Sequence, residues 1–351
     1  MRRTRDGSSA SRILIRLPNW VGDILLALPA LLALRAGRPR AHLVGMVRPQ
    51  HVELASRISA IDRIVPAPAA AGRLPAWWRA VRRLRAARLQ AAVLLAPSFE
   101  GALTALAAGI PVRVGHRTDR RALLLTHALD PARRPHRADG FLELVGVLGV
   151  GPVSGPLPFR LQAAERRHVD RLFAGAGLSG RDRPVLVNPA AAKTPRAWSA
   201  DRFRRLAETI ADRHPGLPVL VHSHPPFAPP AGWPRHPAIR SVRDVTLVQL
   251  GAVIERCCLY VGNDSGPMHL AAALGVPTVG IYGPSSPACT SPRGAPGTAH
   301  RAVSSSPSCS PCRERFFDEC PAPPTADGRP PCLDAVAVED VAAEVDRLLQ
   351  L

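Results

Sequence analysis

Lysine and aromatic residues are scarce in this chain of 351 residues. Lys193 is the only lysine among 46 basic residues, and Phe, Trp and Tyr together make up 4% of the sequence. With few aromatic side chains to stack on bases, and no zinc-finger or recognition-helix pattern, the composition argues against a nucleic-acid-binding module. No GxGxxG pattern follows the first predicted strand, which argues against a dinucleotide oxidoreductase.

Long apolar runs are also missing. The longest, from Ile24 to Leu34, contains Pro29 and covers eleven residues, whereas a membrane-spanning helix needs roughly 20. The start of the chain is basic, but the apolar stretch after it is interrupted by polar residues and has no small-residue cleavage pattern. We therefore expect residues 1–11 to be a disordered leader and the protein to be cytoplasmic.

Acidic residues are outnumbered, with 27 Asp and Glu against 46 Lys and Arg, which gives a formal net charge of +19. Hydrophobic residues make up 46% of the chain, a value typical of folded soluble proteins. The excess positive charge favours an anionic partner, such as a phosphorylated glycolipid or an anionic bilayer surface.

The chain is long enough for two domains of roughly 150 residues. In both halves, short apolar strands alternate with amphipathic helices, the pattern of a parallel sheet covered on both faces. The predicted fold class is α/β with two Rossmann-like, doubly wound domains. The expected divisions are a first domain at 12–160, a linker at 161–182, a second domain at 183–335 with a Cys- and Pro-rich segment at 284–334, and a C-terminal helix at 336–351.

The strongest local pattern is VGNDSGPMHLAAALGVPTVGIYGPSSP, residues 261–287. A predicted strand ends near Asp264, and a helix begins near Gly266 and Pro267. The exposed N–H groups and the dipole of that helix would suit a diphosphate. Alternatively, Asp264 only caps the helix and His269 is a partly exposed helical histidine.

The second pattern is LPNWVGDILLALPAL, residues 17–31. A strand is followed by Gly22, which allows close backbone approach, and by Asp23 at a helix start. Ligands of doubly wound sheets bind at such strand ends, and a carboxylate there can act as a general base toward a hydroxyl group. The alternative is that Asp23 is a helix cap.

Together these segments resemble the bacterial lipopolysaccharide heptosyltransferase family, glycosyltransferase family 9, and within it most closely the heptosyltransferase II type. The resemblance continues through APSFEGALTALAAGIPVRVGHRTDRRALLLTH (96–127), AWSADRFRRLA (197–207) and PSCSPCRERFFDECP (307–321). It implies two Rossmann domains facing a central cleft, the glycosyltransferase B type, with the acceptor in the first half and the donor in the second. It also implies inverting transfer of L-glycero-D-manno-heptose from ADP-heptose to the lipopolysaccharide inner core, heptosyl-Kdo-lipid A.

Site roles follow from the resemblance, residue by residue. Asp23 corresponds to the catalytic base. The donor-binding loop corresponds to Asp264, Ser265, Gly266, Met268 and His269. No metal or other cofactor is implied for the chemistry, because a helix end and a cation can stabilise the leaving ADP.

Two segments depart from the family pattern. Arg196 stands where the family has a lysine that holds the diphosphate, and Lys193 is a rival phosphate ligand or a solvated surface residue. The stretch HSHPPFAPP, 222–230, lacks the acidic residue that contacts the nucleotide ribose in related sequences. These departures leave open a different nucleotide-sugar donor, or a non-catalytic relative that binds a nucleotide sugar or glycolipid.

Cations near predicted strand ends or loops of the first half could bind the carboxylates and phosphates of the acceptor. Besides Gly22, the acceptor-binding candidates are Arg48, Arg113, Arg117, Arg120 and Arg121. Each of these arginines could equally be a solvated surface residue.

Four cysteines, Cys309, Cys312, Cys320 and Cys332, are spaced C-x2-C-x7-C-x11-C. Only the first pair has the spacing of a metal knuckle, so a structural zinc ion, free thiols and disulfides all remain open.

The segment PAWWRAVRRLRAARL, residues 75–89, predicts a basic amphipathic helix. This helix could lie on the inner face of the cytoplasmic membrane as a peripheral anchor, or be buried with a solvated arginine face.

Overall fold

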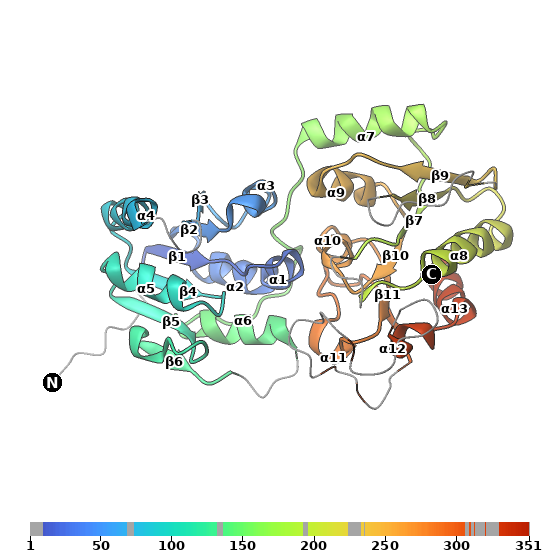
Figure 1. Cartoon of the computed structure of the whole chain (residues 1–351). Helices are drawn as coiled ribbons and strands as arrows, with labels where there is room; N and C mark the ends of the chain where they lie inside the picture. The colour runs from blue at the N-terminus through green and yellow to red at the C-terminus, as the bar shows by residue number, and fades with distance from the viewer. Residues whose placement is uncertain are drawn as a thin grey trace. The chain divides into compact units, whose positions relative to one another are not determined.

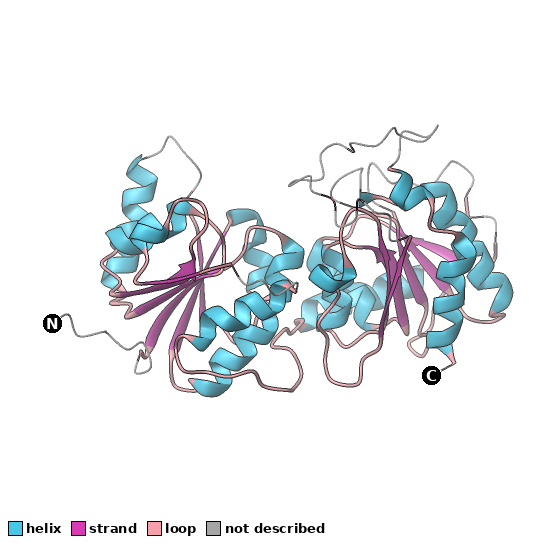
Figure 2. Cartoon of the chain, turned by 90° about the horizontal axis from the view of Figure 1, so that it is seen from below, coloured by secondary structure: helices cyan, strands magenta, loops and turns pink. Residues whose placement is uncertain are grey.

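The computed structural model describes residues 10–68, 74–131, 136–191, 196–223, 233–234, 236–305, 309, 312, 320 and 330–350. The chain divides into two compact units, Met1–Arg160 (unit 1) and Leu161–Leu351 (unit 2) (Figure 1). Each unit holds a parallel six-stranded sheet with helices on both faces (Figure 2). The predicted fold class of two doubly wound α/β sheets is therefore confirmed.

The sheet of unit 1 has the strand order β3-β2-β1-β4-β5-β6. Its strands are β1 (Arg12–Arg16), β2 (His42–Val47), β3 (Arg63–Pro66), β4 (Ala91–Leu94), β5 (Val112–His116) and β6 (His127–Leu129). β1 and β4 are neighbours, and the order runs in opposite directions on either side of them. The loops after β1 and β4 therefore diverge to opposite faces of the sheet, which opens the crevice where doubly wound sheets bind ligands.

The helices of unit 1 are α1 (Val21–Leu26), α2 (Leu28–Gly37), α3 (Val52–Ala55), α4 (Leu74–Ala86), α5 (Phe99–Ala107) and α6 (Arg137–Gly146). Two short 3-10 turns, η2 (Pro49–His51) and η3 (Ala122–Leu124), complete it. α6 packs with α1 and α2, while α4 packs with α5. The sequence predicted one helix after β1, but the chain forms two, since Pro29 cannot donate a backbone hydrogen bond and lies in the first turn of α2.

Unit 2 repeats the arrangement, with strand order β12-β11-β10-β7-β8-β9. The strands are β7 (Val185–Asn188), β8 (Val219–His222), β9 (Ile239–Val242), β10 (Leu259–Asn263), β11 (Thr278–Tyr282) and β12 (His300–Ser304). Here the order reverses at β7 and β10. These two strands and β11 are buried along their whole length, as expected for the centre of a parallel sheet.

The helices of unit 2 are α7 (Ala163–Gly175), α8 (Ala200–Arg213), α9 (Leu247–Glu255), α10 (Gly266–Ala273), α11 (Pro287–Thr290), α12 (Pro331–Asp334) and α13 (Val338–Leu349). The segment predicted as a linker, 161–182, contains α7, which packs against α9. Of the predicted leader, residues 1–9 lie outside the described residues. Ser11 is ordered against the sheet, because its backbone N–H donates to the Gln90 side chain at 2.7 Å.

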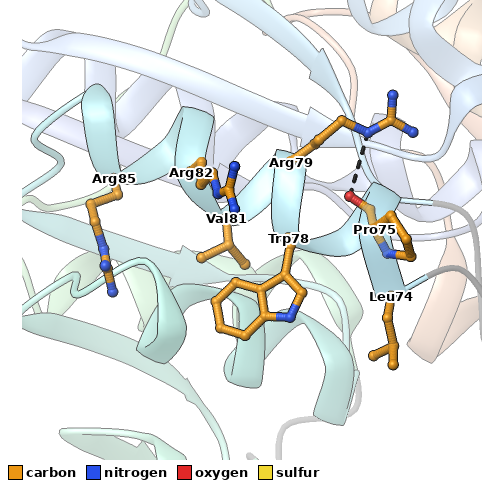
Figure 3. Close-up of a pocket in the computed structure, with 7 residues that line it drawn as sticks. All are labelled: Leu74, Pro75, Trp78, Arg79, Val81, Arg82 and Arg85. Atoms are coloured by element: carbon orange, nitrogen blue, oxygen red, sulfur yellow. Dashed lines mark hydrogen bonds between the residues drawn. The ribbon is translucent and has the colours of Figure 1, made fainter.

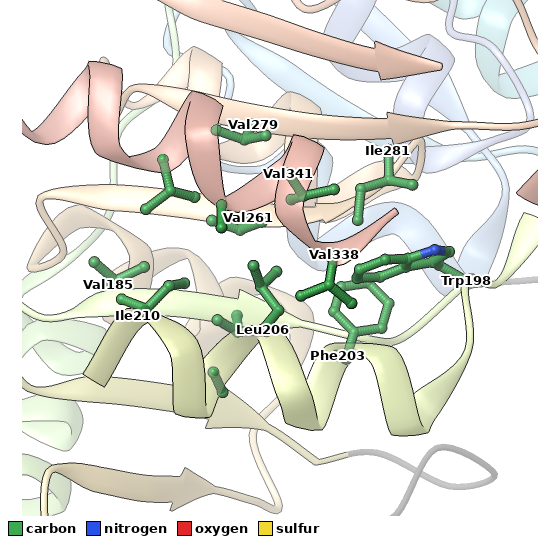
Figure 4. Close-up of a cluster of buried hydrophobic side chains, with 14 of the residues drawn as sticks. Val185, Trp198, Phe203, Leu206, Ile210, Val261, Val279, Ile281, Val338 and Val341 are labelled. Atoms are coloured by element: carbon green, nitrogen blue, oxygen red, sulfur yellow. The ribbon is translucent and has the colours of Figure 1, made fainter. Parts of the chain in front are cut away.

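Trp198 anchors the core between α8, α13 and the sheet of unit 2 (Figure 4). Its side chain is fully buried and meets Phe203 edge to face, with 5.0 Å between ring centroids. Its indole N–H donates to the carbonyl of Val336 at 3.1 Å. The loop after β7 is thereby tied to the segment that leads into α13.

Replacing Trp198 with alanine should lower the free energy of unfolding of unit 2 by about 3–5 kcal/mol, because a large cavity opens beside Phe203. Chemical denaturation followed by circular dichroism measures the change. Trp78→Ala is the matched control, because Trp78 is 48% exposed and its loss should cost less than about 1 kcal/mol. Equal losses in the two variants would contradict this account of the core.

Candidate active site

At the reversal point of unit 2, the loops after β7 and β10 are joined by Asn263, the last residue of β10. Its side-chain oxygen accepts from the Trp198 backbone N–H at 2.9 Å, and its side-chain nitrogen donates to the Pro189 carbonyl at 3.0 Å. This buried amide fixes both ends of the 189–198 loop against the strand that carries Asp264. Lys193, the predicted rival phosphate ligand, lies outside the described residues.

Asp264 is almost fully buried, with 3% of its surface exposed. One of its oxygens, Oδ2, accepts from Arg196 Nη2 at 2.6 Å, from Thr290 Oγ1 at 3.1 Å and from the Ser285 hydroxyl. The helix cap of α10 is Ser265, not Asp264, and the Ser265 side chain makes no capping hydrogen bond. The alternative that Asp264 is only a helix cap is therefore wrong.

His269 lies on the other side of the same carboxylate, with 3.5 Å between its Nε2 and Asp264 Oδ1. It is buried rather than partly exposed, with 5% of its surface accessible. Burial alone would raise the pKa of Asp264, but the hydrogen bond from His269 and the charge of Arg196 outweigh it and hold the pKa well below its ordinary value. Asp264 is therefore an ionised, internally neutralised carboxylate.

The chemical capacity of this site comes from a cation beside an uncapped helix end. Asp264 fixes the Arg196 guanidinium, which keeps 26% of its side chain exposed, and α10 begins two residues after Asp264. The amino end of a helix and a guanidinium both bind phosphate oxygens. The predicted diphosphate site requires these two features, a helix end and a cation, and its occupant stays a prediction.

Within the predicted donor-binding loop, Met268 is fully buried, and Tyr282 donates to its sulfur at 3.8 Å. Ser265 and Gly266 are half-buried at the start of α10. Gly266 supplies the first helical N–H group, and the buried Met268 side chain holds this turn against β11.

His222 ends β8 in a buried polar network. Its Nδ1 lies 3.0 Å from Asn188 Oδ1, and Asn188 Nδ2 donates to the Tyr260 hydroxyl at 2.8 Å. The rest of the stretch that lacks the expected acidic residue, 224–230, is outside the described residues.

In unit 1, Asp23 lies in the first turn of α1, and a short loop, residues 17–20, connects β1 to this helix. Its Oδ1 accepts from Arg137 Nη1 at 2.6 Å, and its side chain is 18% exposed. The residue at the helix cap is Trp20, so the alternative that Asp23 is a cap is also wrong. Sequence reasoning missed Arg137, the first residue of α6, because 114 residues separate the pair and no motif includes it.

The acceptor-binding candidates differ in their surroundings. Arg121 is fully buried and donates to the carbonyls of His116, Ala96 and Leu94. Arg113 donates to the carbonyls of Leu124 and Ile110. These two guanidinium groups join backbone segments, so their expected role as acceptor ligands has no support in the geometry.

Other candidates face solvent. Arg48 and Arg120 are exposed beyond the ends of β2 and β5, and Gly22 is half-buried in α1. Arg117 is exposed but pairs with Asp130 at 3.0 Å. A further cation, Arg16, was not predicted: it is buried at the end of β1, donates to Asn19 Oδ1 at 2.9 Å, and its pKa is lowered to about 10 by burial.

None of the seven cysteines forms a disulfide, so the disulfide alternative is wrong. Cys332 is buried in the core of unit 2, and burial raises the pKa of its thiol to about 11. Within the described residues, His, Cys, Asp and Glu form no group of three suited to a metal ion. Most of the segment between Cys309 and Cys332 lies outside the described residues, and the zinc interpretation stays a prediction.

A half-buried histidine, His300, lies close enough to His269 for the charge of His269 to act on it. His300, the first residue of β12, has its Nδ1 3.0 Å from Thr278 Oγ1 on β11. Burial lowers the pKa of His300 to about 4, and the charge of His269 acts in the same direction. His300 is therefore neutral in the folded protein at pH 7.

No helix in the described part of the chain combines the length and apolar character that crossing a membrane requires.

Comparison with known proteins gives consistent matches. Residues 77–321 match the family model of glycosyltransferase family 9 (heptosyltransferase). Lipopolysaccharide heptosyltransferase 2 of Salmonella typhimurium is 30% identical over 307 residues, which cover 80% of this chain and 85% of that protein. The Escherichia coli enzyme of the same name is 29% identical over 307 residues, which again cover 80% of this chain and 85% of that protein.

Solved structures match along nearly the whole chain. The E. coli ADP-heptose lipopolysaccharide heptosyltransferase II structure has a TM-score of 0.75 at 24% identity and covers 97% of this chain and 98% of its own. The E. coli heptosyltransferase WaaC with ADP has a TM-score of 0.70 at 18% identity, with coverage of 96% and 99%. At these identities the structures show that the fold is shared.

The neutral His300 predicts a pH dependence of stability. The unfolded chain takes up a proton near pH 6.5, whereas the folded chain takes it up only near pH 4. Stability should therefore be complete above pH 6.5 and fall by about 3 kcal/mol as the pH drops to 4. Urea unfolding at several pH values measures this slope, and His300→Gln should flatten it. His168→Gln, on α7, is the matched control, and identical slopes in wild type and His300→Gln would contradict the assignment.

Proposed function

Because the chain belongs to glycosyltransferase family 9, the heptosyltransferases, we propose that it transfers L-glycero-D-manno-heptose from ADP-heptose to heptosyl-Kdo-lipid A, with inversion at the anomeric carbon. Membership of this family makes the protein a glycosyltransferase of lipopolysaccharide core synthesis. The donor, the acceptor and the stereochemistry are our proposal. The observation that carries it is the Arg196–Asp264 pair beside the uncapped amino end of α10.

On the donor side, Arg196 and the amino end of α10 hold the diphosphate of ADP-heptose in this proposal. Asp264 itself is too buried to reach a ligand, so we assign it the role of orienting Arg196 and His269. Ser265 and Gly266 offer backbone N–H groups to the phosphates, and Met268 positions their turn. The relative solved with ADP, and a further structure of it with ADP-2-deoxy-2-fluoro heptose, support a nucleoside-diphosphate sugar as the donor.

On the acceptor side, Asp23 is the general base. The acceptor hydroxyl gives its proton to the Asp23 carboxylate while its oxygen forms a bond to C1 of the heptose. The bond from C1 to the β-phosphate oxygen breaks on the opposite face, and ADP leaves with the bonding electrons. Arg137 orients the carboxylate before the acceptor arrives.

Charge on the departing ADP is stabilised by groups that are already in place. Arg196 is held by Asp264, so little reorganisation is needed as negative charge develops on the phosphate oxygen. The proposed chemistry uses no cofactor. Of the predicted acceptor ligands, Arg48 and Arg120 keep this role in the proposal, because both are exposed beyond strand ends.

One observation favours a second candidate, a related glycosyltransferase with another nucleotide-sugar donor. The stretch 222–230 contains no Asp or Glu. Without a carboxylate there, the ribose of the nucleotide must be contacted by other groups, so the nucleotide preference is open to change. Competition among ADP, UDP and GDP for the purified protein distinguishes the two candidates.

The acceptor is a glycolipid, so we place the reaction at the cytoplasmic face of the inner membrane. The test of the proposal is ADP release from ADP-heptose with and without heptosyl-Kdo-lipid A. Acceptor-dependent release supports it. If the nucleotide is released only from a different nucleotide sugar, the result favours the second candidate.

Replacing Asp23 with asparagine should lower kcat by 10²- to 10⁴-fold, the usual contribution of a general base, while ADP binding is retained. Asp130→Asn is the matched control, because that carboxylate also pairs with an arginine of unit 1 but lies at β6. ADP release and isothermal titration with ADP measure the two effects. Wild-type turnover in Asp23→Asn would rule out this base.

Ser285→Ala should weaken the hold of Asp264 on Arg196 and raise the KM for ADP-heptose about tenfold, the effect of losing one hydrogen bond to a charged group. The acceptor KM should stay unchanged. Ser286→Ala is the control, because the Ser286 side chain does not cap α11. If both variants bind donor equally well, the Asp264 cluster does not position the phosphate ligand.

A further inference from the structure

Exposed large hydrophobic side chains are unevenly distributed along the chain. Those among the described residues are Trp20, Leu74, Trp78, Phe99, Leu106, Leu123 and Val153, and every one belongs to unit 1. Five of them lie on α4, α5 and η3. Helix α5 packs against α4 on one side and contacts η3 as well. The described residues of unit 2 expose no comparable side chain.

Helix α4 presents the most extended part of this surface. Its inner side is fixed, because Val81 and Leu84 are buried and Trp77 Nε1 donates to Thr104 Oγ1 of α5 at 2.9 Å. Leu74 and Trp78, one helical turn apart, are 71% and 48% exposed. Both extend to the same side of the helix, opposite to Arg79 (Figure 3). The two apolar groups therefore stand on a rigid support and have no covering segment among the described residues.

The same helix carries a concentrated positive charge. We use the name α4 face for the exposed long side chains of this helix: Leu74, Trp78, Arg79, Arg82, Arg83 and Arg85. The sequence contains no acidic residue between Asp62 and Glu100. Arg85 donates to the Ala107 carbonyl at 2.8 Å, whereas Arg82 and Arg83 have no carboxylate or hydrogen-bond partner in the parts of the chain that the structure covers.

We infer that the α4 face docks on an anionic phospholipid bilayer. A bilayer offers both partners that this face needs: lipid phosphates for the arginines and an apolar interior for Leu74 and Trp78. Tryptophan is the side chain that favours the boundary between these two zones. The inference rests on the proposed function in one respect, because an acceptor with a lipid A anchor remains in the membrane while its sugar is extended.

A nucleic acid would satisfy the arginines but not the apolar pair. Binding of a single-stranded nucleic acid uses several aromatic rings, on which successive bases stack along a basic groove. The pocket beside α4 is lined by one aromatic ring, Trp78, next to Leu74 and Val81 (Figure 3). Charge complementarity combined with exposed aliphatic and indole groups favours the bilayer.

Cosedimentation of the full chain with vesicles tests this inference. Binding should be strong with phosphatidylglycerol–phosphatidylethanolamine vesicles, weak with phosphatidylcholine vesicles, and reduced by salt. The double variant Arg82→Glu/Arg83→Glu should weaken vesicle binding more than tenfold. The double variant Leu74→Ser/Trp78→Ser should weaken it at least severalfold at high salt, where the charges are screened and apolar contacts contribute more. Thermal melts confirm that both variants fold.

The matched control is Arg167→Glu/Arg171→Glu on α7, which changes the net charge by the same amount at exposed positions of unit 2. It should leave vesicle binding within twofold of wild type. Equal weakening by the control would show a general effect of the net charge, and unchanged binding in the α4 variants would exclude this face. Binding of a single-stranded RNA is measured with the same proteins. If the α4 variants lose RNA binding but keep vesicle binding, the inference is also overturned.

Turnover separates this inference from the proposed function. The α4 variants should transfer heptose normally to a detergent-dispersed acceptor and slowly to the same acceptor embedded in vesicles. If even the wild-type protein does not transfer heptose, the proposed function is wrong. The vesicle-binding measurements then still decide whether α4 docks on a bilayer. If vesicle-embedded and dispersed acceptors respond alike to the α4 changes, docking through this face is wrong.

Discussion

The buried charge of Asp264 is the constraint on which the site of unit 2 depends. An isolated carboxylate in this position would be very costly, so its oxygens must meet donors from the surrounding chain. Oδ2 accepts hydrogen bonds from Arg196, in the loop after β7, and from Ser285 and Thr290, in the segment after β11. His269 of α10 lies 3.5 Å from Oδ1. Satisfying one carboxylate thereby fixes three segments at one edge of the sheet, and the cation that can meet a phosphate is fixed as a consequence.

Asp23 shows the opposite balance. It has one arginine partner and keeps 18% of its side chain exposed, whereas Asp264 has several partners and keeps 3%. A carboxylate that must accept a proton from a substrate has to be reachable and incompletely satisfied, and a carboxylate that orients other groups does not. Both follow a central strand at the reversal of strand order, so the same topology can support the chemical role proposed for Asp23 and the organising role proposed for Asp264.

The sequence alone was sufficient to predict structural features that one continuous segment of the chain forms. The strand, loop and helix around Asp264 and the turn that carries Asp23 were predicted, because apolar periodicity and an adjacent Gly or Pro determine them locally. Partners distant in sequence were not predictable: Arg137 is 114 residues from Asp23, and Ser285 is 21 from Asp264. Edge strands such as β6, with three residues, are too short to give a periodic pattern and are stabilised mainly by their neighbours.

Arginine was the least informative residue type, and the structure explains why. Arg121 and Arg113 use their guanidinium groups to join backbone carbonyls, Arg196 neutralises a buried carboxylate, and Arg82 lies in solvent. All four have the same charge, so composition cannot distinguish their roles. Their roles differ because different hydrogen-bond acceptors lie within reach of each guanidinium group. A guanidinium surrounded by carbonyls is committed to the fold, whereas one on a helix without nearby carboxylates leaves its charge to be met by a partner. Arg82 and Arg83 of α4 are arginines of the second kind, so this helix is one place where the net charge of +19 is open to a partner.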